Sequence, residues 1–409
     1  MRQFGEEGSG KLGILFVHSA TQPPLGADTW VQSQIVSGLD KSRFAAHVAC
    51  AIGAPAHPTP TYKIMRDIQG INVVPIDFGR ERWSFARYPR ARTLLAALPA
   101  ASSVVRLARY IRRHEIAIIH TTDRPRDAVA CVILARLTRA RCIVHAHVAF
   151  NPDWMGRFLQ RAIRRADGLI AISEFVASTL RSAGIDSSRI HVVPNAIDAS
   201  GWNPGVGREE RRKEFGFSSG DHVVLTVCRL FPAKGPTELI RALALVHAVR
   251  SDVRLLIVGR EMERGYADTL KSLAMELGLE RHVILAGQRS DVPALMAAAD
   301  IYAMPSRFEP FGLVYLEAMA MELPVVALND GGTPEVVEDG RDGLLSHPDD
   351  VRSLADNLLR LVNEPHTRAE MGRHGRHRAQ TFFTIDRMAR GCESVYRLLA
   401  WNGKTDGML

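Results

Sequence analysis

The sequence predicts an α/β protein made of two doubly wound domains. Short apolar runs alternate with amphipathic helical stretches almost from end to end, a rhythm typical of βαβ units and parallel sheets. A chain of 409 residues, 46% of them hydrophobic, is too long for one ordinary core and suits two domains of roughly 200 residues each. The alternation breaks at residues 198–212, which are rich in Asn, Pro and Gly and then charged, as expected of a linker.

The N-terminal half begins with a strand-like apolar run that is followed by a predicted helix at residues 29–39. The strands predicted in this half lie at residues 12–18, 45–52, 73–76, 116–120, 142–147, 168–172 and 190–194. They are short and apolar and are bounded by polar or turn-forming residues, as buried strands of a parallel sheet are.

The C-terminal half repeats this pattern. Its predicted strands lie at residues 223–229, 254–259, 282–286, 301–304 and 323–328, and its helices at 236–249, 266–277, 292–298 and 312–321. Closing helices follow at 350–363 and 386–401. We therefore predict domains at residues 1–205 and 206–385, with a final helix and tail at 386–409. Ligands of such folds bind at the carboxyl ends of the strands, so a cleft between the domains is the expected site.

The net charge of +8 is concentrated in one segment. From Arg80 to Arg113 there are nine arginines and one acidic residue, Glu81. With the aromatic and leucine side chains between them, they suit anionic lipid headgroups or a lipid-diphosphate acceptor. A solvated basic helix packed on its own domain is the alternative. Nucleic acid is not expected as a partner, because no recognition motif accompanies the charge.

Several other classes of protein are not expected. No stretch approaches the roughly 18 apolar residues of a membrane span, and no signal peptide is visible. We therefore expect a cytoplasmic protein, held at most at the inner face of the membrane. Five scattered cysteines without a CxxC pair indicate neither a disulfide framework nor a zinc site. Neither a GxGxxG turn after the first strand nor a P-loop sequence occurs, which argues against NAD and P-loop nucleotides.

The strongest motif is SRFEPFGLVYLE at residues 306–317. Glu309 falls in the loop after a strand, Gly312 opens a helix, and Glu317 lies about one and a half turns into that helix. This helix is apolar nearly all round, so Glu317 should be buried, where a carboxylate is costly without hydrogen-bond donors. Sugar hydroxyls would suit both glutamates. The alternative is that Glu317 pairs with an arginine and Glu309 is solvated.

Two further segments leave strand ends in the same half. Gly331 and Gly332 precede a helix that Thr333 can cap, and free N–H groups there would suit an anion. Arg229 and Lys234 follow the first strand of this half and would suit a diphosphate. Taken singly, an ordinary capped turn and solvated cations are the simpler interpretations. Together with the two glutamates, these residues describe a pocket for a diphosphate with a sugar at each end.

The stretch SRFEPFGLVYLEAMAMELPVVALNDGGTPEVVEDGRDGLL resembles a family signature. It looks like that of the retaining, nucleotide-sugar-dependent glycosyltransferases of family 4, which have the GT-B fold of two Rossmann-like domains facing across a cleft. The segment around Arg229 and Lys234 resembles the family's diphosphate-binding strand end. Weaker marks occur at residues 172–174 and 193–198. The resemblance covers roughly residues 12–385.

In the C-terminal domain the resemblance implies the site of the sugar donor. Glu309 would hold hydroxyls of the donor sugar and Glu317 the ribose. Arg229 and Lys234 would stabilise the leaving diphosphate, so that neither a metal nor another cofactor is needed. The sequence contains no Asp-x-Asp, the usual metal carrier of the other glycosyltransferase fold. The remaining donor-binding positions are Gln288, Val292, Phe311, Gly312, Leu313, Gly331 and Gly332.

In the N-terminal domain the resemblance implies the acceptor site. His147 matches the family's histidine beside the donor sugar, His145 is the competing choice, and a buried strand histidine is the alternative. Gly26 matches a glycine of the loop near the point of transfer. The family's next glycine is Ala27 here, and its Cβ changes how the backbone can approach a ligand, so we expect retained activity with altered acceptor geometry. The final helix would cross back to this domain.

The resemblance therefore implies a retaining, metal-independent hexosyltransferase. It would move a hexose from a UDP- or GDP-linked donor to a hydroxyl acceptor, a glycan or a lipid-linked sugar, in bacterial polysaccharide or glycolipid assembly. Two other functions remain open. One is a nucleotide-sugar epimerase or sugar phosphorylase of similar fold. The other is a non-catalytic subunit that binds sugar nucleotides, against which the intact Arg229, Lys234, Glu309 and Glu317 argue.

Overall fold

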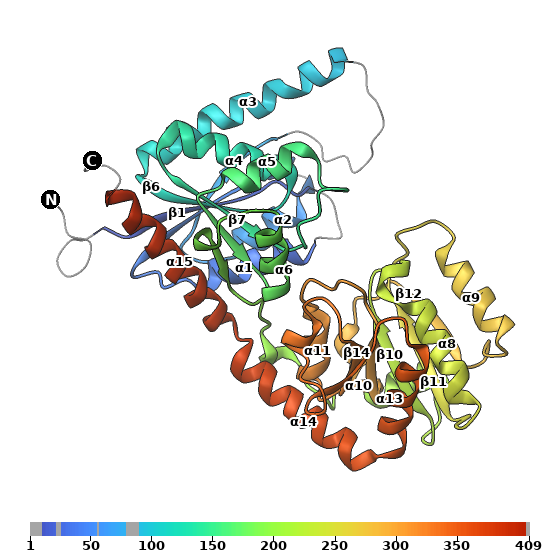
Figure 1. Cartoon of the computed structure of the whole chain (residues 1–409). Helices are drawn as coiled ribbons and strands as arrows, with labels where there is room; N and C mark the ends of the chain where they lie inside the picture. The colour runs from blue at the N-terminus through green and yellow to red at the C-terminus, as the bar shows by residue number, and fades with distance from the viewer. Residues whose placement is uncertain (1–9, 22–25, 55–56, 79–89, 406–409) are drawn as a thin grey trace. The chain divides into compact units, whose positions relative to one another are not determined.

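Two parallel sheets with helices packed against them make up the computed structural model of the chain (Figure 1). The structure describes residues 10–21, 26–54, 57–78 and 90–405, with the backbone alone for 90–99 and 402–405. Met1–Pro194 and Ile385–Leu409 form the N-terminal unit, and Asn195–Thr384 form the C-terminal unit. Both units are doubly wound, which confirms the predicted fold class.

The N-terminal sheet has the strand order β5-β2-β1-β6-β7-β8-β9, and all of its neighbouring strands are parallel. From β1 the chain winds outward to β2 and β5 and then returns to β6 on the other side, so the direction of winding reverses between β1 and β6. The strands are β1 (Leu12–His18), β2 (Phe44–Cys50), β5 (Asn72–Pro75), β6 (Ile116–Thr122), β7 (Arg141–Ala146), β8 (Gly168–Ala171) and β9 (Ile190–Val192). A small antiparallel hairpin pairs β3 (Gly53–Ala54) with β4 (His57–Pro58).

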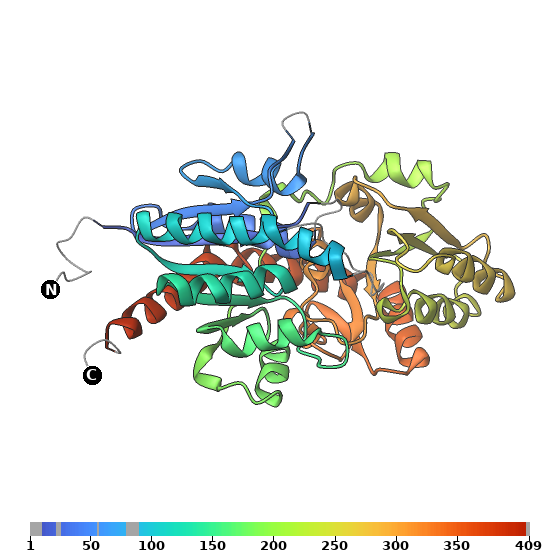
Figure 2. The same ribbon diagram turned by 90° about the horizontal axis from the view of Figure 1, so that it is seen from above.

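Helices α3, α4 and α5 pack side by side on one face of this sheet, and α1 and α15 pack together on the other (Figures 1 and 2). The helices of the unit are α1 (Ala27–Gly38), α2 (Pro60–Arg66), α3 (Arg90–Arg113), α4 (Pro125–Thr138), α5 (Arg157–Arg165), α6 (Glu174–Ser182) and α15 (Ile385–Thr405), with a 3-10 turn at Ser187–Arg189. Within the described ranges, no helix is long and apolar enough to cross a membrane.

The closing helix α15 is anchored to the N-terminal unit by buried polar contacts. The hydroxyl of Tyr396 is hydrogen-bonded to Nδ1 of His120 at 2.6 Å, and both side chains are fully buried. The carboxylate of Glu393, which is also buried, accepts a hydrogen bond from the N–H of Asp40 at 2.8 Å. These contacts join α15 to β6 and to the turn after α1. The last helix of the chain is therefore part of the core of the N-terminal unit.

The C-terminal sheet has the order β12-β11-β10-β13-β14-β15 and is also parallel throughout. Its strands are β10 (His222–Val227), β11 (Val253–Val258), β12 (Val283–Gly287), β13 (Ile301–Met304), β14 (Val325–Leu328) and β15 (Gly343–Ser346). The winding direction reverses between β10 and β13, as it does between β1 and β6 in the other unit.

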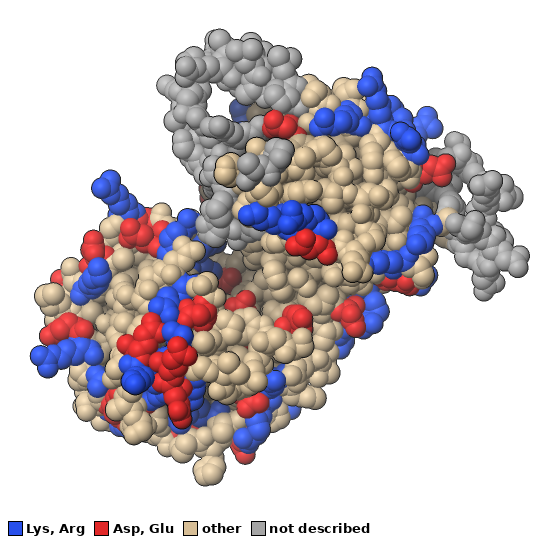
Figure 3. All heavy atoms as spheres, turned by 180° about the vertical axis from the view of Figure 1, so that it is seen from behind, with Lys and Arg blue, Asp and Glu red and all other residues tan. Residues whose placement is uncertain are grey.

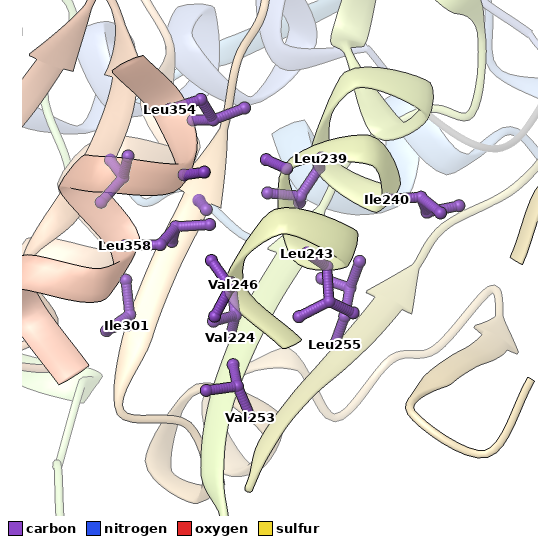
Figure 4. Packing of buried hydrophobic residues seen from close by; sticks show 14 of the residues in the cluster. Val224, Leu239, Ile240, Leu243, Val246, Val253, Leu255, Ile301, Leu354 and Leu358 are labelled. Atoms are coloured by element: carbon purple, nitrogen blue, oxygen red, sulfur yellow. The ribbon is translucent and has the colours of Figure 1, made fainter. Parts of the chain in front are cut away.

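The helices of the C-terminal unit bury an aliphatic core against this sheet. Figure 4 shows Leu239 and Leu243 of α8 meeting Leu354 and Leu358 of α13 over strand residues such as Val224. The helices are α7 (Arg208–Glu214), α8 (Pro236–His247), α9 (Tyr266–Glu276), α10 (Val292–Ala298), α11 (Leu313–Ala320), α12 (Thr333–Val336), α13 (Val351–Asn363) and α14 (Pro365–Phe382), with 3-10 turns at Ala199–Gly201 and Pro232–Lys234.

The division between the units lies earlier than residues 205 and 206, where the sequence predicted it. Ile197 forms a parallel bridge with Thr384, and its N–H donates to the carbonyl of Phe383 at 3.1 Å. The segment that follows Pro194 is therefore part of the C-terminal unit rather than a free linker. Residues 208–214 of the predicted linker form helix α7.

Besides α7, two elements of the C-terminal unit were not predicted, namely β15 and α14. Helix α14 has the sequence PHTRAEMGRHGRHRAQTF, and the residues it buries are Met371, Gly372, Gly375 and Ala379. Gly372 lies so close to the carbonyl of Glu322 that no Cβ fits there. A helix that packs through glycine and alanine lacks the apolar stripe on which sequence recognition depends.

We expect Tyr396→Phe to lower the free energy of unfolding by about 1–3 kcal/mol, because it leaves Nδ1 of the buried His120 without a partner. Urea unfolding followed by circular dichroism measures this loss. Tyr62→Phe is the matched control, since the Tyr62 hydroxyl has no hydrogen bond within the described ranges, and should change stability by less than about 0.5 kcal/mol. Equal losses in the two variants would show that the buried hydrogen bond does not anchor α15.

Candidate functional site

The carboxyl ends of β10, β13 and β14 carry most of the predicted site. Arg229 and Lys234 lie in the loop after β10, and Glu309 lies in the loop after β13. β10 and β13 flank the point where the winding of the sheet reverses. Ligands of doubly wound sheets bind at this position.

Lys234 and Glu309 form an ion pair between Nζ and Oε2. Their side chains are only 15% and 9% exposed. The guanidinium carbon of Arg229 lies 5.7 Å from the ring centre of Phe231, and Nζ of Lys234 lies 6.0 Å from the same centre. The structure therefore brings together three of the four predicted catalytic residues. The alternative of a solvated Glu309 is wrong.

Backbone contacts tie the three loops into one body. The N–H of Arg307 donates to the carbonyl of Ala233 at 2.8 Å, which joins the β13 loop to the β10 loop. The N–H of Phe308 donates to Oδ2 of Asp330 at 2.7 Å, which joins the β13 loop to the β14 loop. Phe308 adopts a left-handed φ of 50°, a conformation that costs about 1–3 kcal/mol for a residue other than glycine. These hydrogen bonds hold the strained turn that precedes Glu309.

Gly331 and Gly332 shape the Glu309 loop. Gly331 has a φ of 60°, and a Cβ at this position would lie 2.6 Å from the carbonyl oxygen of Glu309. The N–H of Gly332 donates to that same carbonyl at 2.7 Å, so it is not free for a ligand. The predicted cap by Thr333 is also wrong, because Gly332 is the capping residue and α12 has a single turn.

The backbone around Gly312 presents the donors that the sequence predicted. Gly312 is the N-cap of α11, and within the part of the chain that the structure describes, the N–H groups of Phe311, Gly312 and Leu313 have no hydrogen-bond acceptor. The Phe311 side chain is buried and meets Phe383 edge to face, with ring centres 5.9 Å apart. The side chain therefore anchors the loop, and unpaired N–H groups remain at the positive end of the helix.

Glu317 lies on α11 without a partner. Burial raises its pKa to about 7, and among the described residues nothing forms an ion pair or hydrogen bond with its carboxyl group. The alternative of a pairing arginine is not observed. A desolvated, unpaired carboxyl group is costly, and hydroxyl donors of a ligand would lower that cost.

Gln288 and Val292, predicted to lie near the nucleotide base, follow β12. Gln288 is exposed directly after the strand, and Val292 is the half-buried first residue of α10. Between them, Arg289 pairs with Asp291 at 2.7 Å and with Glu214 at 2.8 Å. This segment is at the same edge as Glu309 but two strands beyond β10, so it forms the outer part of the edge.

His147 belongs to the N-terminal unit and follows β7, which ends at Ala146. Its ring lies 4.4 Å from that of His145, and both Nε2 atoms are buried without a partner in the described chain. Burial lowers the pKa of His147 to about 4 and that of His145 well below its usual value, so both imidazoles are neutral at pH 7. His145 lies inside the strand, whereas His147 emerges at the carboxyl edge.

Asp123 fixes the backbone of His147 and was missed in the sequence. It follows β6, and its Oδ2 accepts hydrogen bonds from the N–H groups of His147 at 2.8 Å and Val148 at 3.1 Å. Burial and the charge of Asp28 raise the pKa of Asp123 to about 7. A signal was available, because Asp123 lies in the segment just after the predicted strand at 116–120, as Glu309 lies in the loop after the predicted strand at 301–304.

Gly26 and its neighbours complete the N-terminal edge. Gly26 is the N-cap of α1, and a Cβ at this position would lie 2.2 Å from Oδ1 of Asp28, so the Asp28 carboxylate would have to move. Asp28 pairs with Nε of Arg124 at 2.6 Å and with Nε2 of His18 at 3.3 Å. Ala27 is the exposed first residue of the helix, where no glycine is required. The replacement of the family's second glycine therefore leaves the local backbone regular.

Replacing Glu317 with Gln should change how stability depends on pH. The pKa of Glu317 is about 7 in the folded protein against 4.5 for an exposed glutamate, so the folded state binds the proton more tightly. The wild type therefore loses stability as pH rises from about 4.5 to about 7, and Glu317→Gln does not. Relative to wild type, the variant should gain up to about 3 kcal/mol between the ends of this range.

Urea unfolding at both ends of the range measures the effect, with the exposed Glu276→Gln as the control. Parallel pH profiles for wild type and Glu317→Gln would show that the carboxyl group is not desolvated.

Comparisons with known proteins match the N-terminal and C-terminal halves of the chain to two family models. Residues 33–200 match the family described as Glycosyltransferase Family 4, and residues 207–378 match Glycosyl transferases group 1. A GDP-mannose-dependent alpha-(1-6)-phosphatidylinositol monomannoside mannosyltransferase of Mycolicibacterium smegmatis is 33% identical over 73% of this chain and 80% of its own. A D-inositol 3-phosphate glycosyltransferase of Corynebacterium glutamicum is 34% identical over 61% of each chain. Anabaena HepE, solved in complex with UDP and glucose, is 25% identical with a TM-score of 0.76, over 95% of this chain and 100% of its own.

Proposed function

Because the chain belongs to the family 4 glycosyltransferases and has their GT-B fold, we propose that it is a retaining hexosyltransferase that uses a nucleoside diphosphate sugar. One observation carries the proposal. The Lys234–Glu309 ion pair, with Arg229 beside it, lies where the winding of the C-terminal sheet reverses. An acceptor for sugar hydroxyls and two cations for a diphosphate thus lie together at one edge of the sheet.

The ion pair prepares both partners for the donor. Glu309 is held beside the Lys234 ammonium, and a carboxylate accepts hydrogen bonds from two neighbouring sugar hydroxyls. Lys234 and Arg229 would face the diphosphate and stabilise the charge that grows on it as the glycosidic bond breaks. The unpaired N–H groups of residues 311–313 would donate to oxygens of the same group. This set supplies the charge stabilisation that other enzymes obtain from a metal, so we propose catalysis without one.

Two further residues, Glu317 and His147, are each proposed to contact the donor. The partnerless carboxyl group of Glu317 would bind the ribose hydroxyls and recover part of its desolvation cost. His147, neutral and with an unpaired Nε2, would exchange one hydrogen bond with the donor sugar. Its backbone is held by Asp123, so the ring keeps one position. Gly26 would lie beside the acceptor, which the N-terminal unit would bind.

The relatives suggest which substrates to test first. One relative is named for GDP-mannose and a phosphatidylinositol mannoside, another for inositol 3-phosphate, and HepE was solved with UDP. We therefore propose a GDP- or UDP-linked hexose as donor and a hydroxyl of a lipid-linked or phosphorylated polyol, or of a glycan, as acceptor. The setting would be bacterial glycolipid or polysaccharide assembly in the cytoplasm, at the inner face of the membrane.

Calorimetric titration with GDP and UDP tests the diphosphate site. Arg229→Ala should weaken binding about tenfold to a hundredfold, because it removes charged hydrogen bonds of about 1.5–3 kcal/mol to the diphosphate. Arg352→Ala, at an exposed arginine of α13, is the control and should bind like wild type. Undiminished binding by Arg229→Ala would place the diphosphate elsewhere.

Turnover tests the reaction itself. With GDP-mannose or UDP-glucose and an inositol or phosphoinositide acceptor, nucleotide release should require the acceptor, and NMR of the product should show the donor's anomeric configuration. Glu309→Gln should lower kcat about a hundredfold, and EDTA should have no effect. Inversion of the anomeric centre would contradict retention, inactivation by EDTA would contradict metal independence, and a product formed without acceptor would indicate an epimerase.

A further inference from the structure

A cavity of about 490 Å³ lies in the N-terminal unit between the end of α1 and helix α15. Its walls come from Gly38 and Asp40 at the end of α1, from Arg43 just before β2, and from a row of α15 side chains. Both helices belong to this unit and pack together on one face of its sheet (Figure 1). The cavity is large enough for a small organic ligand, because ligand pockets of proteins measure about 300–1,000 Å³.

This cavity lies at the opposite edge of the sheet from the candidate site. The carbonyl of Arg43 accepts a hydrogen bond at 2.8 Å from the N–H of Leu12, the first residue of β1. The cavity is therefore at the amino ends of the strands, whereas His147 follows the carboxyl end of β7. It is also separate from the arginine-rich segment at 80–113. That segment contributes no residue to the cavity, and its residues 80–89 lie outside those that the structure describes.

Helix α15 turns a polar face toward the cavity. The side chains with which it lines the cavity recur at spacings of three and four residues, which places them on one side of the helix. They are Asp386, Arg390, Glu393, Ser394 and Arg397. The other side of α15 is apolar and buried against the unit. The polar face thus lies opposite the turn that follows α1, with the cavity between them.

Three arginines line the cavity, and within the described ranges none of them forms an ion pair. Arg397 donates to the hydroxyl of Ser394 at 3.3 Å, and the side chains of Arg43 and Arg390 have no hydrogen bond in that part of the chain. In the C-terminal unit, by contrast, basic and acidic side chains lie next to one another (Figure 3), and several of them form ion pairs. The three guanidinium groups of the cavity are therefore available to an anion.

Three carboxylates line the same cavity, but two of them already accept hydrogen bonds. Oδ1 of Asp40 accepts from the N–H of Ser42 at 2.9 Å and from its hydroxyl at 2.5 Å. Oε1 of the buried Glu393 accepts from the N–H of Asp40 at 2.8 Å. Asp386 and the second oxygen of Glu393 have no hydrogen-bond partner among the described residues. The cavity thus offers guanidinium groups to an anion and carboxylate oxygens to O–H groups.

We propose that this cavity binds a soluble phosphate monoester of a polyol, such as a sugar phosphate. The guanidinium groups of Arg43, Arg390 and Arg397 bind the phosphate, whose terminal oxygens accept hydrogen bonds from several directions, whereas a planar carboxylate offers two oxygens. Asp386 and Glu393 accept O–H groups of the polyol. The bound ligand connects the turn after α1 to α15 and so stabilises the N-terminal unit. The inference does not rest on the proposed transferase activity.

Calorimetric titration of the full chain tests the proposal with glucose 6-phosphate, and with inorganic phosphate and glucose, which each carry part of its chemistry. Glucose 6-phosphate should bind with a Kd of about 1 mM or lower, inorganic phosphate more weakly and glucose not measurably. Arg390→Ala should weaken the binding of both phosphate ligands about tenfold or more. Asp386→Asn should weaken the binding of glucose 6-phosphate several-fold but not that of inorganic phosphate, because Asp386 contacts the polyol alone.

Hydrogen–deuterium exchange locates the bound ligand. Glucose 6-phosphate should slow amide exchange at residues 38–44 and 385–397 and leave the loops after β10 and β13 unchanged. Protection of those loops in place of α15 would assign the phosphate to the candidate donor site and would overturn the proposal.

Matched controls lie in the C-terminal unit. Arg352→Ala removes an exposed arginine of α13 and should bind glucose 6-phosphate like wild type. Arg229→Ala should also keep this affinity, so that failure of the cavity is distinguishable from failure of the diphosphate site. The proposal is overturned if neither phosphate ligand binds, if Arg390→Ala binds both like wild type, or if Arg352→Ala loses as much affinity as Arg390→Ala. Arg390 is exposed and has no side-chain contact to lose, so circular dichroism of Arg390→Ala should match that of wild type.

Discussion

The structure around the proposed donor site depends on one ion pair, between the largely buried side chains of Lys234 and Glu309. Removing two charges from water costs several kcal/mol per ion. The attraction between the ions offsets this cost only when their geometry is held in place. The loops after β10 and β13 supply that geometry. Gly235 packs so closely on Pro305 that no side chain fits, and Gly331 does the same against Glu309. Three features keep the pair together. They are the close approach of these loops, the left-handed conformation of Phe308 and the helix cap at Gly332.

Among the residues that the structure describes, both units carry unpaired polar groups near the carboxyl edges of their sheets. In the C-terminal unit these are the N–H groups at residues 311–313 and the carboxyl group of Glu317. In the N-terminal unit, the group is the buried Nε2 of His147, which follows β7. Buried polar groups are normally hydrogen-bonded, so exceptions gathered at strand ends mark positions that a ligand can satisfy.

The sequence by itself determined the two-domain α/β architecture, the family and the strand-end position of Arg229, Lys234 and Glu309, because apolar runs and turn residues act locally. Only the tertiary structure decided which of these groups meet. Glu309 pairs with Lys234, and the Gly332 N–H donates a hydrogen bond to the Glu309 carbonyl. It also revealed helix α14, which packs through glycine, and the hydrogen bond by which Asp123 fixes the backbone of His147. These contacts join residues far apart in the chain, and no local pattern specifies them.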